Sequence, residues 1–186
     1  MKPLWLVRHA QPLVAPGVCY GALDVPADEI ATQEVARRLA DALPGSATVI
    51  TSPLQRCEQL TQALRGLRPD LAYKTDARLM EMDFGHWEGQ RWDAIARTEL
   101  DGWTAAFSTW RCGGAESVGD FMARVGAAWD ETLALNEPVV WITHAGVIRA
   151  ATLLAQGLRQ IDAASQWPIL APAFGAWTVL QRPEPW

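Results

Sequence analysis

Short apolar runs alternate with helical segments along this chain, and this alternation is the feature that most constrains its fold. Leu4 to Val7, Thr48 to Thr51 and Val139 to Ile142 have the composition and length of buried strands. Leu71 to Lys74 is a weaker strand candidate, and Trp177 to Leu180 is the expected last strand. Such alternation predicts an α/β fold, a three-layer α/β/α sandwich with a mostly parallel central sheet.

Capping residues and helix breakers set the expected helix boundaries. A helix is expected over residues 27–43, with Ile30 on its apolar side. It should end at residue 43 because a Pro-Gly pair follows. Ser52 is the expected N-cap of the next helix, in a capping box completed by Gln55. Further helices are expected near Trp92 to Glu99, from a Ser117 cap to Leu133, and over residues 146–156.

The length of 186 residues suits a single domain over residues 1–186. Its 49% hydrophobic and 20% charged residues are typical of a globular protein. Residues 77–117 have the weakest periodicity and are rich in Trp and Gly, so we expect them to form a cap or substrate-specificity insertion. The spacing of the ten tryptophans indicates packing rather than a functional aromatic cluster.

The net charge of −5 argues against nucleic acid as the main partner, because nucleic-acid-binding proteins usually carry a basic surplus. The three cysteines form no CxxC unit, which disfavours a disulfide scaffold or zinc site and favours a reducing compartment. The N-terminus does not resemble a signal peptide, and no apolar stretch reaches the roughly 18 residues of a membrane span. We therefore expect a cytoplasmic protein without a membrane partner.

Polar residues follow several of the expected strands. Arg8 and His9 follow the first strand, Arg56 lies just after the second, and Glu81 lies beyond the third. His144 follows the strand at 139–142. Because ligands of such sheets bind beyond the carboxyl ends of the strands, we expect these five side chains to meet at one site.

This combination of side chains suits phosphate chemistry. Arginine binds phosphate oxygens bidentately and stays charged, so Arg8 and Arg56 are suited to hold the dianion. One histidine is suited to attack phosphorus as a neutral nucleophile, and the other to stabilise the equatorial oxygens. A carboxylic acid protonates the departing alcohol and then activates water.

Metal and nucleotide sites are the competing interpretations. His and Glu are zinc ligands, but the sequence has no H-E-x-x-H spacing or close His pair, and neighbouring arginines would repel a cation. The sequence has neither a P-loop nor a G-x-G-x-x-G motif. We therefore expect neither a metal nor a cofactor.

The same residues lie in motifs that resemble those of the histidine phosphatase superfamily, also called phosphoglycerate mutase-like. The motifs are LVRHAQP at 6–12, TSPLQRCEQL at 51–60, LMEMDFGHWEG at 79–89, GGAES at 113–117 and THAGVIR at 143–149. The resemblance implies the phosphoglycerate mutase-like fold, with His9 as the phosphorylated histidine and Glu81 as the proton donor. It also implies that Arg8, Arg56 and His144 form the phosphate pocket and that no metal takes part.

Two positions depart from the family pattern. Ala10 stands where the family usually has glycine, a small replacement that keeps the pocket usable. The family's GES segment is interrupted by Ala115, which puts a substrate role for Glu116 or Ser117 in doubt.

The stretch from Cys19 to Asp24 resembles the α-ribazole phosphatase branch, which implies α-ribazole 5′-phosphate as substrate. Loop residues Gln11, Tyr20 and Gly21 are candidate substrate-binding residues in addition to the phosphate pocket.

The leading hypothesis is a metal-independent phosphomonoester hydrolase that acts on a small molecule through a phosphohistidine at His9. Two alternatives remain: a phosphoglycerate mutase-type phosphoryl transfer, and a noncatalytic phosphate-binding module. The cofactor-dependent mutases are usually longer, and a pure binder does not need a nucleophile and an acid.

Overall fold

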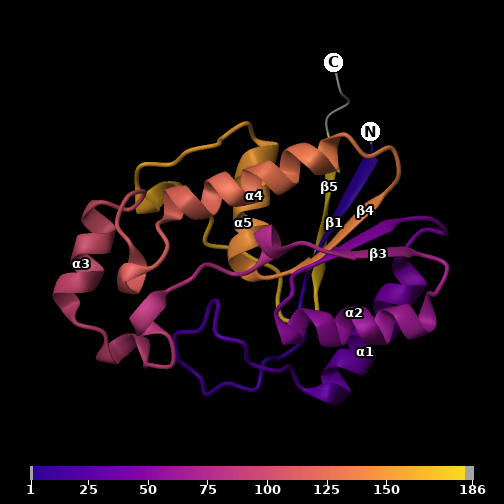
Figure 1. Cartoon of the computed structure of the whole chain (residues 1–186), viewed down its shortest axis with the longest axis horizontal. Helices are drawn as coiled ribbons and strands as arrows, with labels where there is room; N and C mark the ends of the chain where they lie inside the picture. The colour runs from indigo at the N-terminus through magenta and orange to yellow at the C-terminus, as the bar shows by residue number, and fades with distance from the viewer. Residues whose placement is uncertain (1, 183–186) are drawn as a thin grey trace.

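The computed structural model describes residues 2–182 and contains a five-stranded sheet (Figure 1). The strand order is β3-β2-β4-β1-β5, with parallel pairing throughout except that β5 runs antiparallel to β1. The strands are β1 (Lys2–Arg8), β2 (Thr48–Thr51), β3 (Ala72–Thr75), β4 (Val139–Thr143) and β5 (Trp177–Arg182). The predicted mostly parallel sheet is therefore confirmed.

Helices cover both faces of the sheet, which confirms the predicted three-layer sandwich. Figure 1 shows α1 and α2 on one side of the strands and α4 and α5 on the other. The helices are α1 (Glu29–Ala42), α2 (Gln55–Leu67), α3 (Arg97–Ala105), α4 (Val118–Leu133) and α5 (Ala145–Ala155). Among residues 2–182, none of them is long and apolar enough to cross a membrane.

The burial of β4 explains why its sequence is a continuous apolar run. Val140 and Ile142 pack in the core cluster that includes Leu39 and Leu60 of α1 and α2. Val139 and Trp141 pack in the opposite cluster, with residues of α4 and α5. Since successive side chains of a strand point to opposite faces, a strand buried on both faces must be apolar at every position.

The helix expected over residues 27–43 is α1, but it begins two residues later than expected and one of its expected core residues is exposed. Asp28 caps the helix by accepting a hydrogen bond from the Ala31 N–H at 2.8 Å. Ile30 is 73% exposed, which contradicts its expected place on the apolar face. It lies five residues before the buried Val35, which at 3.6 residues per turn is about 140° around the helix.

The expected capping box of α2 is wrong. The helix begins at Gln55, and its first N–H group is satisfied from a distant loop. The Gln55 N–H donates to Asp24 Oδ1 at 2.7 Å, and the Gln55 side chain donates to the Asp24 carbonyl at 3.0 Å. The Asp24 carboxylate thus occupies the position expected for Ser52, whose Oγ accepts from the Leu54 N–H at 3.3 Å and also pairs with His144 Nε2. The Ser117 cap of α4 is confirmed, since its Oγ accepts from the Asp120 N–H at 3.1 Å.

The segment 77–117 is irregular, as expected, but the helix predicted near Trp92 to Glu99 is misplaced. A 3-10 turn spans Trp92–Ala94, and α3 follows only at Arg97. Ile95 has an extended backbone and a buried side chain, which interrupts the helical path. α3 lies far from the strands, at the left of Figure 1.

Candidate active site

The strand pairing brings the predicted site residues to one edge of the sheet. β1 and β4 pair in a register that sets Arg8 beside Thr143, and β2 and β4 set Thr51 beside Ile142. His9 and His144 follow these strands directly, and their ring centroids are 5.2 Å apart. The predicted clustering at the carboxyl ends of the strands is thus present.

His9 is held in one tautomer. Its ring is buried, and Nδ1 lies 2.7 Å from the Ala10 carbonyl oxygen. Because a carbonyl oxygen only accepts, Nδ1 carries the hydrogen and Nε2 keeps its lone pair. Burial, with a smaller contribution from the positive charge of Arg56, lowers the His9 pKa to about 3. The imidazole is therefore neutral at physiological pH, as a nucleophile must be.

His144 lies beside His9 and is also neutral. The Arg56 Nε–H donates to Nδ1 at 3.3 Å, so the ring hydrogen is on Nε2, which lies 2.8 Å from Ser52 Oγ. Burial is the main cause that lowers its pKa well below the usual value, and Arg56 adds to it. His144 thus offers a donor hydrogen rather than a positive charge.

The two arginines have different surroundings. Arg8 lines the cavity at the site, with its guanidinium 3.8 Å from the centre of the Phe174 ring and its Nη1 donating to the Pro172 carbonyl at 3.0 Å. Its Nε is buried without a partner among the described residues. Arg56 is fully buried and donates to the carbonyls of Leu23 and Gly21, at 2.9 and 2.6 Å. Arg56 therefore lies behind the cavity wall, where it also fixes the loop around Gly21.

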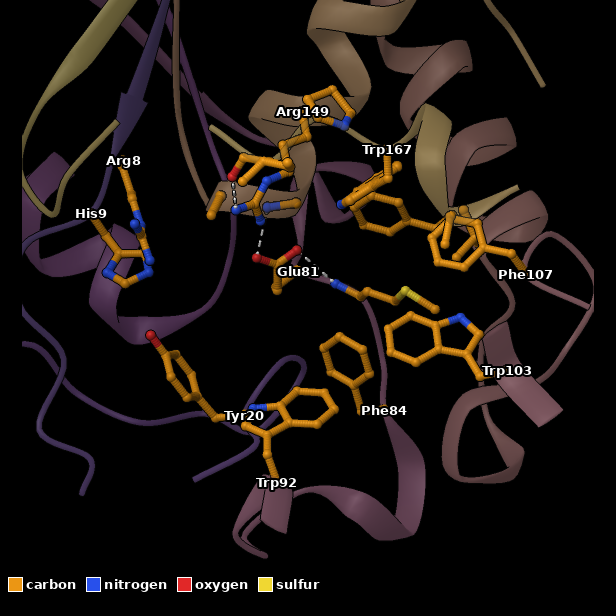
Figure 2. A pocket seen from close by; sticks show the side chains of 18 residues that line it. Arg8, His9, Tyr20, Glu81, Phe84, Trp92, Trp103, Phe107, Arg149 and Trp167 are labelled. Atoms are coloured by element: carbon orange, nitrogen blue, oxygen red, sulfur yellow. Dashed lines mark hydrogen bonds between the residues drawn. The ribbon is translucent and has the colours of Figure 1, made fainter. Parts of the chain in front are cut away.

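Glu81 occupies the cavity wall between the charged end and a group of aromatic side chains (Figure 2). Its Oε2 accepts a hydrogen bond from the Gly146 N–H at 3.0 Å, and its Oε1 accepts from the Met82 N–H at 3.1 Å. A Cβ at Gly146 would lie 2.1 Å from Oε1, so only glycine leaves room for the carboxylate there. The glycine of the THAGVIR motif thus shapes the position of Glu81.

Arg124 of α4 supports the backbone that carries Glu81, and the sequence pattern did not reveal it. Its Nη1 donates to the carbonyls of Arg78 and Met80, at 2.8 and 2.7 Å, and its Nη2 donates to the Glu81 carbonyl at 3.0 Å. The Glu116 carboxylate holds Arg124 through contacts of 2.6 and 2.9 Å. Glu116 is therefore committed to an ion pair and is not among the residues that line the cavity.

The loop residues differ in their positions. Tyr20 lines the cavity, whereas Gln11 is exposed and does not. Gly21 packs so tightly that an added Cβ would lie 1.9 Å from the Met82 carbonyl oxygen. Arg149 of α5 also lines the cavity; it is the last residue of the THAGVIR motif but was not predicted as a site residue. Its Nη2 donates to the Ile169 carbonyl at 3.0 Å.

The cavity has a volume of about 610 Å³, within the range of small-molecule sites. Among residues 2–182, no group of three or more His, Cys, Asp or Glu side chains is placed to hold a metal ion. Three of the ten tryptophans line the cavity: Trp92, Trp103 and Trp167. The expectation that the tryptophans serve packing alone is therefore incomplete.

The site combines a neutral, oriented histidine with an arginine and a glutamate, at the edge of the sheet where the parallel strands end. This combination defines a class of phosphoryl-transfer sites. The family comparison agrees with this class, because the model of the histidine phosphatase superfamily (branch 1) matches residues 4–181. The chain belongs to the histidine phosphatase superfamily. A comparison with curated proteins gave no match.

Solved structures similar to this chain include two mycobacterial proteins and one from Thermus thermophilus. Mycobacterial glucosyl-3-phosphoglycerate phosphatase in complex with inorganic phosphate is 26% identical, with a TM-score of 0.79, and the match covers 97% of this chain and 90% of that protein. Mycobacterial hydrolase 2 is 26% identical, with a TM-score of 0.78 and coverage of 96% and 81%. The Thermus protein is 28% identical, with a TM-score of 0.72 and coverage of 98% and 95%.

Proposed function

We propose that the protein is a metal-independent phosphomonoester hydrolase that forms a phosphohistidine on His9. The observation that carries this proposal is the His9 tautomer: the bond from Nδ1 to the Ala10 carbonyl leaves the Nε2 lone pair free. His9 and Arg8 line the same cavity, so an incoming phosphate would meet the nucleophile and a positive charge together. Neighbouring Arg8 and Arg56 also disfavour a metal ion at this position.

The reaction has two steps. In the first, His9 Nε2 forms a bond to phosphorus, the bond from phosphorus to the ester oxygen breaks, and the Glu81 carboxyl protonates the departing oxygen. In the second, Glu81 takes a proton from water, the water oxygen attacks phosphorus, and the bond from phosphorus to Nε2 breaks. Arg8 and Arg56 offset the charge of the phosphoryl group, and His144 turns its Nε2 hydrogen from Ser52 Oγ to an equatorial oxygen.

We further propose that the substrate is a small molecule and that residues 77–117 form its specificity cap. This segment supplies Glu81 and several aromatic side chains of the cavity wall. The family likeness of residues 19–24 makes α-ribazole 5′-phosphate one candidate substrate, and Tyr20 of this stretch lines the cavity. Glucosyl-3-phosphoglycerate, the substrate in the name of one structural neighbour, is a second candidate. The three buried free cysteines support a reducing location such as the cytoplasm.

A direct test is hydrolysis of p-nitrophenyl phosphate by the purified protein in the presence of EDTA, followed as free phosphate. Steady phosphate release that persists with the chelator is the expected result. A mutase-type transfer would instead need a phosphorylated donor and would interconvert isomers without net phosphate release. Absence of turnover with tight phosphate binding would favour the noncatalytic module, and loss of turnover with EDTA would contradict metal independence.

A further inference from the structure

The cavity beyond Glu81 has an uneven distribution of charge. Figure 2 shows Arg8 and His9 at one end of the cavity and Glu81 and Arg149 in its middle. At the other end Figure 2 shows Phe84, Trp92, Trp103, Phe107 and Trp167 around the remaining space. We call this part of the cavity the aromatic chamber, defined by these five side chains.

The rings of the aromatic chamber form flat and edge-on walls. Trp103 and Phe107 stack with centroids 5.5 Å apart and an angle of 16° between their planes. Trp167 meets Phe107 edge-on at 6.3 Å, and Trp92 meets Phe84 edge-on at 5.4 Å. Aromatic ligands favour such surroundings, because offset-stacked and edge-to-face contacts add to the gain from burying apolar area.

The lining of the chamber does not suit a sugar or polyol. Among the described residues that line the whole cavity, none is Asp, Asn, Gln, Ser, Thr or Lys. A sugar placed in the chamber would find only the indole N–H groups of Trp92, Trp103 and Trp167 as side-chain partners for its several hydroxyl groups, and each unpaired buried polar group is unfavourable. The apolar lining extends to the outer edge of the cavity, where Ile169 is 89% exposed.

We propose that the aromatic chamber binds the alcohol part of the substrate and selects phosphate monoesters whose alcohol carries a planar aromatic group. This inference rests on the proposed function, since the chamber opens directly on the phosphate end of the same cavity. The aromatic group occupies the space that the five side chains of the chamber line, while the phosphate lies at Arg8 and His9. Phosphorylated sugars and polyols without an aromatic group are correspondingly poor substrates, which disfavours glucosyl-3-phosphoglycerate, the second candidate named above.

A set of primary-alcohol monoesters tests the selectivity with matched leaving groups. 2-(2-Naphthyl)ethyl phosphate is compared with ethyl phosphate, glycerol 3-phosphate and glucose 6-phosphate by phosphate release. We expect a kcat/KM at least about 100-fold higher for the naphthylethyl ester, because a buried bicyclic ring removes aromatic area from water. Equal or higher kcat/KM for glucose 6-phosphate would overturn the proposal, while hydrolysis of p-nitrophenyl phosphate would still support the phosphatase.

Two variants locate the effect. Trp103→Leu keeps an apolar side chain but removes the stacking surface, and it should lower kcat/KM for the naphthylethyl ester about tenfold more than kcat/KM for ethyl phosphate. Trp110→Leu is the matched control. Trp110 packs against Gly102 of α3, the helix that carries Trp103, but it does not line the cavity. A comparable loss in both variants would indicate a loosened α3 and contradict a role of the chamber in binding.

Binding without turnover separates this proposal from the phosphatase activity. Calorimetry with 2-(2-naphthyl)ethylphosphonate and ethylphosphonate measures affinity whether or not the protein hydrolyses esters. The naphthyl compound should bind at least about 30-fold more tightly to the wild type and lose most of this advantage in Trp103→Leu. Equal affinities for the two phosphonates would refute the chamber even if the phosphatase activity is found.

Discussion

Gly146→Ala should disable proton donation by Glu81 while leaving the phosphate site intact. The added Cβ would lie 2.1 Å from Glu81 Oε1, whereas real Cβ contacts are at least 3.0 Å, so the carboxylate must retreat by about 0.9 Å (3.0 minus 2.1). The retreat also weakens the bond from the Gly146 N–H to Oε2, now 3.0 Å long. Because the obstructed atoms are at the end of a flexible side chain, the fold itself should tolerate the change.

The expected loss follows from this displacement. A misplacement of about 1 Å in an active site costs up to about 10²-fold in rate, or roughly 2.7 kcal/mol of transition-state stabilisation. Alkyl phosphates depend on protonation of the leaving oxygen, so their kcat/KM should fall by about 10². Nitrophenolate leaves without a proton, so p-nitrophenyl phosphate should lose less than about fivefold.

The assay compares kcat/KM for both esters in the wild type, Gly146→Ala and Glu81→Gln. Gly66→Ala is the matched control: Gly66 lies in α2, and an added Cβ there meets nothing within 4 Å. It should leave both activities unchanged and raise stability by up to about 1 kcal/mol. Equal losses on the two esters in Gly146→Ala, or full activity on alkyl phosphates, would refute the positioning of Glu81 by Gly146.

Other contacts of the site and its supporting segments lead to four more predictions. Arg124→Ala frees the backbone that carries Glu81 and should lower kcat for alkyl phosphates at least about tenfold more than for p-nitrophenyl phosphate, which a general loss of folded protein would not do. Because the pKa of buried His9 is lowered to about 3, its ring resonances should not titrate between about pH 8 and 5 in NMR; a midpoint near 6.5 would contradict this burial. The unfolded chain takes up that proton near pH 6.5 and the folded chain does not, so the free energy of unfolding should decline as the pH falls from about 6.5 towards 3, as measured by urea titration. Asp24→Ala should lower the free energy of unfolding by about 1 kcal/mol through the lost α2 cap, and Asp24→Asn should retain most of it.

The parts of the fold that could be predicted are those with a local physical signal. β4 is buried on both faces, so its apolar run identified it as an internal strand. The position of His9 and His144 after parallel strands predicted that they would meet, because the carboxyl ends of such strands share one edge. The start of α4 was predictable because Ser117 satisfies the Asp120 N–H within the first turn.

The parts that could not be predicted depend on contacts between distant segments. Asp24 caps α2 from 31 residues away, and Arg124 binds the Glu81 carbonyl from 43 residues away. A polar residue on a helix or loop gives no sign in the sequence of which distant backbone group it will meet. The aromatic chamber is similar, because Trp103 of α3 and Trp167 of the segment before β5 both pack against Phe107. Ile30 is a case in which a local signal misleads. An apolar residue at the start of a helix suggested burial, but Ile30 lies on a different side of α1 from the buried Val35 and is exposed.

The proposed mechanism requires a covalent bond between phosphorus and His9 Nε2. To test for this bond, wild-type protein is mixed with p-nitrophenyl phosphate, the reaction is stopped rapidly at alkaline pH, and the peptides are analysed by mass spectrometry. We predict one added phosphoryl group on the peptide that contains His9, stable in alkali and lost in acid, and its absence in His9→Ala together with at least a ~10³-fold fall in kcat. Label on another residue, or activity of His9→Ala within about tenfold of wild type, would contradict His9 as the nucleophile.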